Sequence, residues 1–159
     1  MNVLVIIPTY NERESLPRIV PLVMQQDVRL LIVDDESPDG TGAVAEAFAR
    51  EYEGRIAVLH RTGKRGLGRS YVDGFRRAIE MGVDAAVQMD ADLSHDPSYL
   101  PSLLAALSTA DIAIGSRYVH GISVVNWPLK RLILSTMGNR YVRVITGLPH
   151  RAMSPTGEP

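Results

Sequence analysis

Short runs of apolar and often β-branched residues alternate with amphipathic stretches along this chain. Residues 3–7 form a continuous apolar run, 28–33 is apolar except for Arg29, and 56–59, 85–89 (apart from Gln88) and 112–114 are shorter apolar segments. An uninterrupted apolar run is typical of a strand buried on both faces of a sheet. The pattern therefore predicts five strands separated by helices. That order favours an α/β fold with a mostly parallel sheet and helices on both of its faces.

The stretches between the apolar runs carry the spacing and the end signals of helices. Asn11, with Glu14 three residues later, has the pattern of a capping box. Thr41 is the expected cap of the next helix. A long amphipathic helix is expected over about residues 129–145. We expect its apolar face to pack in the core, with an anionic lipid surface as the alternative.

Length and composition set further limits. The 159 residues suit one domain with a sizeable core, expected over residues 1–149, followed by a polar, unstructured tail at 150–159. A formal net charge of -1 argues against nucleic-acid binding. The absence of cysteine excludes disulfides and thiolate metal sites. Because we find neither a signal peptide nor about 18 consecutive apolar residues, a cytoplasmic chain is expected.

The Asp90-Ala91-Asp92 segment directly follows one of the predicted strands. In parallel sheets ligands bind outside the carboxyl ends of the strands. Two carboxylates one residue apart can both reach one hard cation, Mg²⁺ or Mn²⁺. The alternative is a pair of turn or capping aspartates. The other predicted strands also end in polar residues, and this convergence favours the metal site.

Two further strand ends carry candidate chemistry. The acidic loop after residue 33 brings Asp35, which can hold a base or a ribose, although a solvated turn is the alternative. The glycine-containing loop 63–68, with Lys64 and Arg65, resembles a phosphate cradle before a helix. The sequence contains no P-loop, dinucleotide fingerprint or serine nucleophile elbow, and its four histidines show no metal-ligand spacing.

Taken in order, these segments resemble the glycosyltransferases of family 2, which have the GT-A nucleotide-sugar-binding fold. Within that family the chain most resembles the polyprenol-phosphate (dolichol-phosphate) mannosyltransferases. The resemblance covers about residues 3–149 and rests on five segments: Pro8-Thr9-Tyr10-Asn11-Glu12, Val33-Asp34-Asp35 with Ser37-Pro38-Asp39-Gly40-Thr41, Gly66-Leu67-Gly68, Asp90-Ala91-Asp92 and Gly115-Ser116-Arg117-Tyr118.

The resemblance implies an inverting, metal-dependent enzyme that moves mannose from GDP-mannose to a polyprenyl (dolichyl) phosphate. It implies that Asp90 and Asp92 hold Mg²⁺ or Mn²⁺, and that Asp92 belongs to the catalytic residues. Many relatives have glutamine as a third metal-site residue where this chain has Ser94. The implied nucleotide-sugar pocket consists of Pro8, Tyr10, Glu12, Val33, Asp35, Lys64, Arg65, Asp90 and Ala91.

The acceptor side of the site is implied by the same resemblance. Arg117 and Arg131 are the expected catalytic cations, and with Ser135 and Asn139 they form the expected site for the acceptor phosphate. Because that acceptor is a lipid, peripheral contact with the cytoplasmic face of a membrane is expected.

Two other functions are compatible with the sequence. One is a related family 2 transferase that uses UDP-glucose or another donor. The other is a donor-binding fragment without turnover, because relatives continue after Gly147-Leu148-Pro149 with an Asp-x-Thr-Gly-Gly-Phe-Arg-like segment that is replaced here by the polar residues 150–159. This departure predicts a C-terminally incomplete transferase domain.

Overall fold

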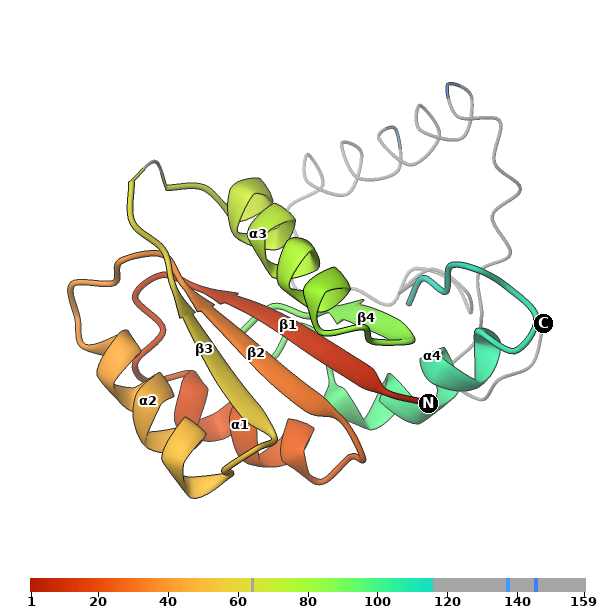
Figure 1. Cartoon of the computed structure of the whole chain (residues 1–159), viewed down its shortest axis with the longest axis horizontal. Helices are drawn as coiled ribbons and strands as arrows, with labels where there is room; N and C mark the ends of the chain where they lie inside the picture. The colour runs from red at the N-terminus through yellow and green to blue at the C-terminus, as the bar shows by residue number, and fades with distance from the viewer. Residues whose placement is uncertain (64, 116–136, 138–144, 146–159) are drawn as a thin grey trace. The chain divides into compact units, whose positions relative to one another are not determined.

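The computed structural model describes residues 1–63, 65–115, 137 and 145 of the chain. The chain divides into two compact units, Met1–Ser98 and Tyr99–Pro159. The first unit contains four described strands in one sheet with the order β3-β2-β1-β4 (Figure 1). All neighbouring strands in this sheet are parallel, as the sequence predicts.

Four of the five predicted strands are confirmed. They are β1 (Val3–Thr9), β2 (Arg29–Asp34), β3 (Ile56–His60) and β4 (Ala85–Gln88). The register places Ile6 of β1 beside both Leu31 of β2 and Gln88 of β4. Because the strands are parallel, their carboxyl ends meet at one edge of the sheet, as expected of a sheet with ligands at that edge.

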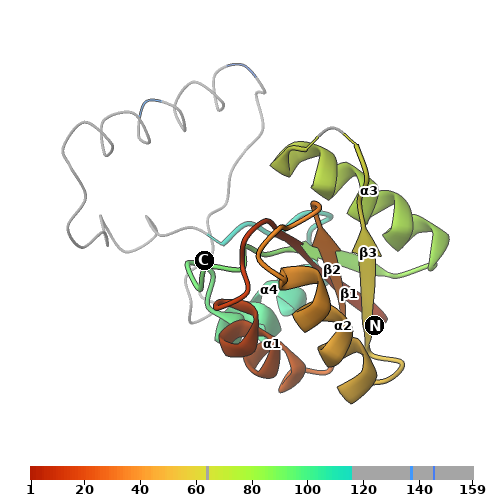
Figure 2. The ribbon, with the colours of Figure 1, turned by 90° about the vertical axis from the view of Figure 1, so that its left-hand side faces the viewer.

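The helices of the first unit cover both faces of the sheet. Helices α1 (Leu16–Met24) and α2 (Thr41–Glu51) lie on one face, and α3 (Leu67–Glu80) lies on the other (Figure 2). The α1 side chains that face inward are fully buried: Leu16, Ile19, Val20 and Val23. Each such burial contributes about 1.5–3 kcal/mol to folding, which makes this apolar stripe the main reason that α1 forms.

The two predicted helix caps are wrong. Helix α1 begins after Ser15, and Asn11 has a left-handed backbone conformation with φ of 59° well before the helix. Helix α2 has Gly40 at its N-cap, also in the left-handed region, so Thr41 is the first residue of the helix. The side chain of Thr41 instead accepts a hydrogen bond from the backbone of Glu12. Contacts between loops therefore override the local capping signals.

The predicted strand at residues 112–114 does not form. Only Gly115 is in a bridge, and Ile112 and Ile114 are 74% and 59% exposed. An apolar run of three residues is too short to indicate a strand by itself. The helix expected after Asp96-Pro97 does form, as a 3₁₀ turn (Pro97–Tyr99) followed by α4 (Leu100–Ala106), and α4 belongs to the second unit.

Most of the predicted long helix at 129–145 lies outside the described residues. The exceptions, Met137 and Ile145, are helical, and each side chain is 66% exposed. Exposure at these two positions contradicts the expected core packing there. Within the described residues, no helix is long and apolar enough to cross a membrane. The domain limits at 149 and 150 remain predictions.

Helix α3 lies close against the sheet at Gly74. On this face Leu4, Ile6, Leu31 and Val33 of the strands form one buried cluster with Ala78 of α3. A Cβ atom built on Gly74 would lie 2.6 Å from Cγ2 of Ile6 and 3.5 Å from Cγ2 of Val33. Glycine is therefore required at the crossing point of helix and sheet, because any side chain would displace α3.

We expect Gly74→Ala to lower the free energy of unfolding by about 1–3 kcal/mol, the usual cost of overpacking a core. The matched control is Gly68→Ala in the same helix, where an added Cβ has no atom within 4 Å. There alanine should be neutral or stabilising, by up to about 1 kcal/mol, through its higher helix propensity. Urea denaturation of both variants checks this, and an equal loss in the two would contradict the packing argument.

Candidate functional site

A pocket of about 250 Å³ lies at the carboxyl edge of the sheet, within the first unit. Seven residues predicted from the sequence line it, from the ends of three strands: Pro8, Tyr10, Glu12, Asp35, Asp90, Ala91 and Asp92. Three further lining residues, Thr9, Leu67 and Ser70, were not predicted. The structure thus brings Asp35, from the expected nucleotide pocket, and the expected metal ligands Asp90 and Asp92 to one pocket.

The loop after β1, which carries Tyr10 and Glu12, is held by side chains of the loop after β2. Three successive backbone N–H groups donate to that loop: Asn11 to Oγ of Ser37 at 3.1 Å, Glu12 to Oγ1 of Thr41 at 2.9 Å and Arg13 to Oδ2 of Asp39 at 3.2 Å. The hydroxyl of Thr41 also donates to Asp39 and lowers the pKa of that carboxyl. Asp39 is therefore ionised at neutral pH and keeps the two loops joined.

Asp35 is nearly buried, and both oxygens of its carboxylate accept hydrogen bonds. Its backbone N–H donates to the carbonyl of Thr9, which fixes the residue at the end of β2. Its Oδ1 is paired with the guanidinium of Arg61, and its Oδ2 accepts the backbone N–H of Gly66 at 2.8 Å. Asp35 therefore connects the pocket to the glycine-containing loop.

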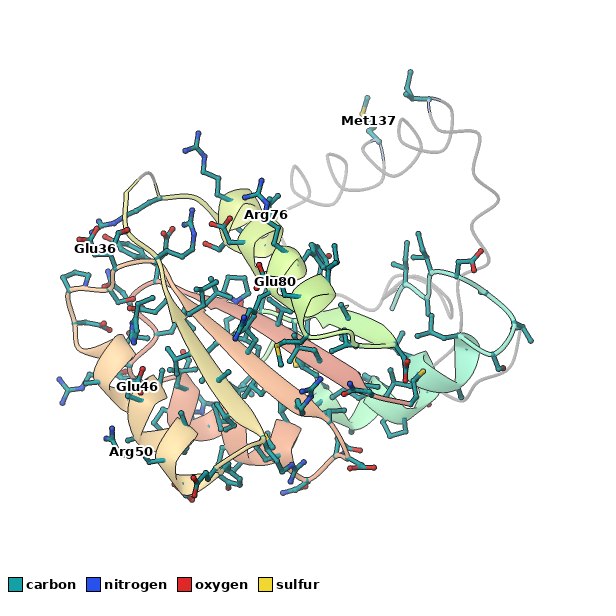
Figure 3. All side chains as sticks on the ribbon, in the orientation of Figure 1. Glu36, Glu46, Arg50, Arg76, Glu80 and Met137 are labelled. Carbon is teal, nitrogen blue, oxygen red and sulfur yellow. The ribbon has the colours of Figure 1, made fainter. Side chains whose placement is uncertain are left out.

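Arg61 lies between two carboxylates, and only 9% of its side chain is exposed. Besides Asp35 it contacts Asp73 of α3, with Nε 2.8 Å from Oδ2, and it donates to Oγ of Ser70 at 3.2 Å. The hydrogen bond from Arg61 is the main reason that the pKa of Asp73 is lowered. Arg76, on the outer side of α3, is the second partner of Asp73 (Figure 3).

Asp90 and Asp92 are both on the pocket wall, and each has one oxygen held by a neutral donor. Oδ1 of Asp90 accepts the hydroxyl of Tyr71 at 2.9 Å, and the backbone N–H of Asp90 donates to Nδ1 of His95 at 3.0 Å. Oδ1 of Asp92 accepts the backbone N–H of Ser94 at 2.9 Å. Hydrogen bonds from Ser94 lower the pKa of Asp92, so this carboxylate is ionised at neutral pH.

The donor set around Asp90 and Asp92 fits a divalent metal that shares its coordination with a ligand. Among the described residues, no three His, Cys, Asp or Glu side chains cluster tightly enough to enclose an ion. Mg²⁺ and Mn²⁺ prefer oxygen ligands, and Mg²⁺ is commonly held by one or two carboxylates together with substrate phosphates and water. Two acidic side chains on the wall of an open pocket match that pattern.

Arg65 lies at the rim of the pocket rather than inside it. Its guanidinium is 4.8 Å from the centre of the Tyr10 ring and donates to the Tyr10 hydroxyl at 2.9 Å. It also donates to the backbone carbonyl of Glu36 and lies 3.8 Å from the carboxylate of the same residue. Arg65 thus joins the three loops that follow β1, β2 and β3.

The remaining predicted site residues are not brought to this pocket in the described structure. The side chain of Val33 is fully buried in the core cluster on the α3 side of the sheet. Five others lie outside the described residues and stay predictions: Lys64, Arg117, Arg131, Ser135 and Asn139.

Five residues that support the site were not predicted from the sequence. Arg61 and Tyr71 contact the carboxylates of Asp35 and Asp90. Ser70 and Asp73 contact Arg61, and His95 accepts the backbone N–H of Asp90. Tyr71 has the spacing of an apolar helix face, which hides the role of its hydroxyl. Only position in the sequence could have indicated these residues. Arg61 directly follows a strand, and Ser70, Tyr71 and Asp73 lie in the first turns of the helix after the glycine-containing loop.

Comparison with known proteins decides the family. Residues 4–155 match the family model described as "Glycosyl transferase family 2", which is nearly the whole chain. The chain belongs to glycosyltransferase family 2. This result confirms the resemblance that was drawn from the five sequence segments.

Several curated members of family 2 are similar to the chain over most of its length. It is 53% identical over 152 residues to the undecaprenyl-phosphate mannosyltransferase of Micrococcus luteus, covering 93% of this chain and 61% of the relative. It is 52% identical over 148 residues to the polyprenol monophosphomannose synthase of Mycolicibacterium smegmatis (91% and 56%). It is 43% identical over 140 residues to the dolichol-phosphate mannosyltransferase of Pyrococcus furiosus (85% and 38%). The chain thus spans no more than 61% of these relatives' length.

Solved structures agree on the fold. The mannosyltransferase PcManGT of Pyrobaculum calidifontis, in complex with GDP-Man and Mn²⁺, has a TM-score of 0.52 and 27% identity, covering 57% of this chain and 27% of that one. Residues 1–349 of S. aureus TarS have a TM-score of 0.56 and 21% identity (79% and 39%), a likeness of fold alone. The predicted GT-A type of α/β fold is therefore confirmed for this family 2 chain.

We expect Arg61→Met to destabilise the family 2 chain by about 3–5 kcal/mol, because it leaves the nearly buried Asp35 carboxylate without its cation. Arg77→Met is the matched control, since Arg77 pairs with Glu80 on the exposed surface of α3. Losing that pair should change the stability by no more than about 0.5 kcal/mol. Chemical denaturation measures both effects, and a small loss for Arg61→Met would show that the ion pair contributes little.

The lowered pKa of Asp73 predicts how stability depends on pH. A carboxyl whose pKa is lower in the folded chain stabilises it above the unfolded pKa, and this contribution is lost as pH falls through the folded pKa. Replacing Asp73 with asparagine should therefore flatten the decline in unfolding free energy between about pH 5 and pH 2. In the Arg61→Met background the same replacement should have a much smaller effect. Equal flattening in both backgrounds would rule out Arg61 as the cause.

Proposed function

We propose that this chain carries the donor-binding part of a polyprenol-phosphate mannosyltransferase. In the proposed reaction mannose passes from GDP-mannose to a polyprenyl phosphate, with inversion at the anomeric carbon. The observation that carries the proposal is the pocket that gathers Asp35, Asp90 and Asp92. This pocket belongs to a chain that is 53% identical to an undecaprenyl-phosphate mannosyltransferase and 52% identical to a polyprenol monophosphomannose synthase.

The two sides of the pocket suit the two ends of a sugar nucleotide. We assign Asp35 and Tyr10 to the nucleoside, because a carboxylate can accept hydrogen bonds from a base or ribose and an aromatic ring offers a stacking surface. We assign Asp90 and Asp92 to the diphosphate end, where they would hold Mn²⁺ or Mg²⁺. When bound there, the metal would offset the charge that develops on the leaving diphosphate.

The acceptor chemistry needs cations more than a general base. A phosphate monoester has a second pKa of about 6, so the acceptor is mostly dianionic at neutral pH and is already nucleophilic. We assign Arg117, Arg131, Ser135 and Asn139 to this phosphate, on the resemblance alone. Because the proposed acceptor is a lipid, we also propose peripheral contact of the enzyme with a membrane, at its cytoplasmic face.

Isothermal titration calorimetry of the 159-residue chain tests the donor assignment. The chain should bind GDP-mannose more tightly with Mn²⁺ than without it, and should bind UDP-glucose weakly. Tighter binding of UDP-glucose than of GDP-mannose would contradict the proposed donor. Transfer is assayed separately with radiolabelled donor and polyprenyl phosphate, so that metal-dependent binding without transfer would identify a donor-binding chain without turnover.

Asp92→Asn should remove the metal dependence of donor binding, because a neutral amide is a weak ligand for Mn²⁺. Asp96→Asn is a closely matched control. Each aspartate accepts a backbone N–H two residues later, from Ser94 and Ser98 respectively, and asparagine keeps that acceptor. Only Asp92 lines the pocket. We expect both variants to fold as stably as the parent, and an equal loss of binding in both would argue against a metal ligand at residue 92.

A further inference from the structure

The ring of Tyr71 is partly buried and packs against the core of the first unit. It packs against the buried cluster on the α3 side of the sheet, and its plane is stacked on Phe75 with ring centres 6.4 Å apart. A side chain packed on a strand cluster and on its own helix has few rotamers available. The position of its hydroxyl is therefore set by the core and not by the pocket.

That hydroxyl reaches a carboxylate that little else restrains. Asp90 follows the last residue of β4 by two positions, and its side chain is 41% exposed. The bond to His95 is made by the backbone N–H of Asp90 and leaves the side chain free to rotate. The hydroxyl of Tyr71 donates to Oδ1 at 2.9 Å and is therefore the contact that selects one orientation of the carboxylate.

Among the described residues, the second oxygen of Asp90 has only a long contact with His95, whose Nδ1 already accepts the backbone N–H of Asp90. Within the described part of the chain, no hydrogen bond to Oδ2 is found, and Nδ1 of His95 lies 3.9 Å from it. Tyr71 does not line the pocket, whereas Asp90 does. Any effect of Tyr71 on a bound ion therefore passes through Asp90.

We propose that Tyr71 is a positioning residue that orients Asp90 for a divalent cation. The proposal rests on the proposed function, which assigns the cation to Asp90 and Asp92. It adds that the affinity for the ion depends on a side chain of α3 in the core, as well as on the loop that follows β4. Hydrogen-bonding partners of this kind commonly change metal affinity by 10- to 100-fold when they are removed.

The test measures Mn²⁺ binding directly, from the electron paramagnetic resonance signal of free Mn²⁺ in the presence of GDP. Tyr71→Phe keeps the ring and removes only the hydroxyl, so we expect an unchanged melting temperature and about a 10-fold weaker Mn²⁺ affinity. Tyr52→Phe is the matched control, since Tyr52 follows α2 and does not line the pocket. It should bind Mn²⁺ like the parent.

A double-mutant cycle with Asp90→Asn separates positioning from a general loss of structure. If Tyr71 acts through Asp90, then Tyr71→Phe should weaken Mn²⁺ binding no further in the Asp90→Asn background. Equal affinity of the parent and Tyr71→Phe, or additive losses in the cycle, would overturn the role of Tyr71. Failure of the parent itself to bind Mn²⁺ and GDP would instead refute the proposed function.

Discussion

The close contact of α3 with the sheet at Gly74 is the constraint on which the site depends. It sets the height of the helix above β1 and β2, and so the positions of the residues in the turn before it. Ser70 and Asp73 then reach Arg61, and Tyr71 reaches Asp90. The same packing that buries apolar surface thus fixes polar groups on two sides of the pocket. Core and site are one arrangement of α3 rather than two independent features.

Around the pocket, order comes from bonds between side chains and backbone instead of from regular secondary structure. The loop after β1 is held by three acceptors of the loop after β2, and the glycine-containing loop is held through the carboxylate of Asp35. Each of these bonds satisfies a backbone N–H that has no partner in a helix or a strand. The polar residues that resemble turn signals in the sequence therefore act as links between loops.

Local patterns predicted those parts of the fold that local physics determines. Apolar runs identified β1 to β4, and the carboxylates next to strand ends identified Asp35, Asp90 and Asp92, because parallel strands converge whatever their neighbours are. Two local signals failed. The backbone N–H of Asn11 donates to Ser37 in another loop instead of joining a capping box, and the apolar run at 112–114 is too short to indicate a strand by itself. Arg61 and Tyr71 escaped prediction because their partners lie in other elements and no spacing records them.

The three aspartates that line the pocket are not electrically equivalent. Asp35 is neutralised by Arg61, whereas Asp90 and Asp92 receive hydrogen bonds from uncharged donors. Two carboxylates on one wall make that end of the pocket negative. An anionic ligand that enters this end of the pocket without a cation is repelled by these carboxylates. A cation that binds first removes the repulsion. Binding of the cation therefore favours binding of the anionic ligand, and binding of the ligand favours binding of the cation to the same extent.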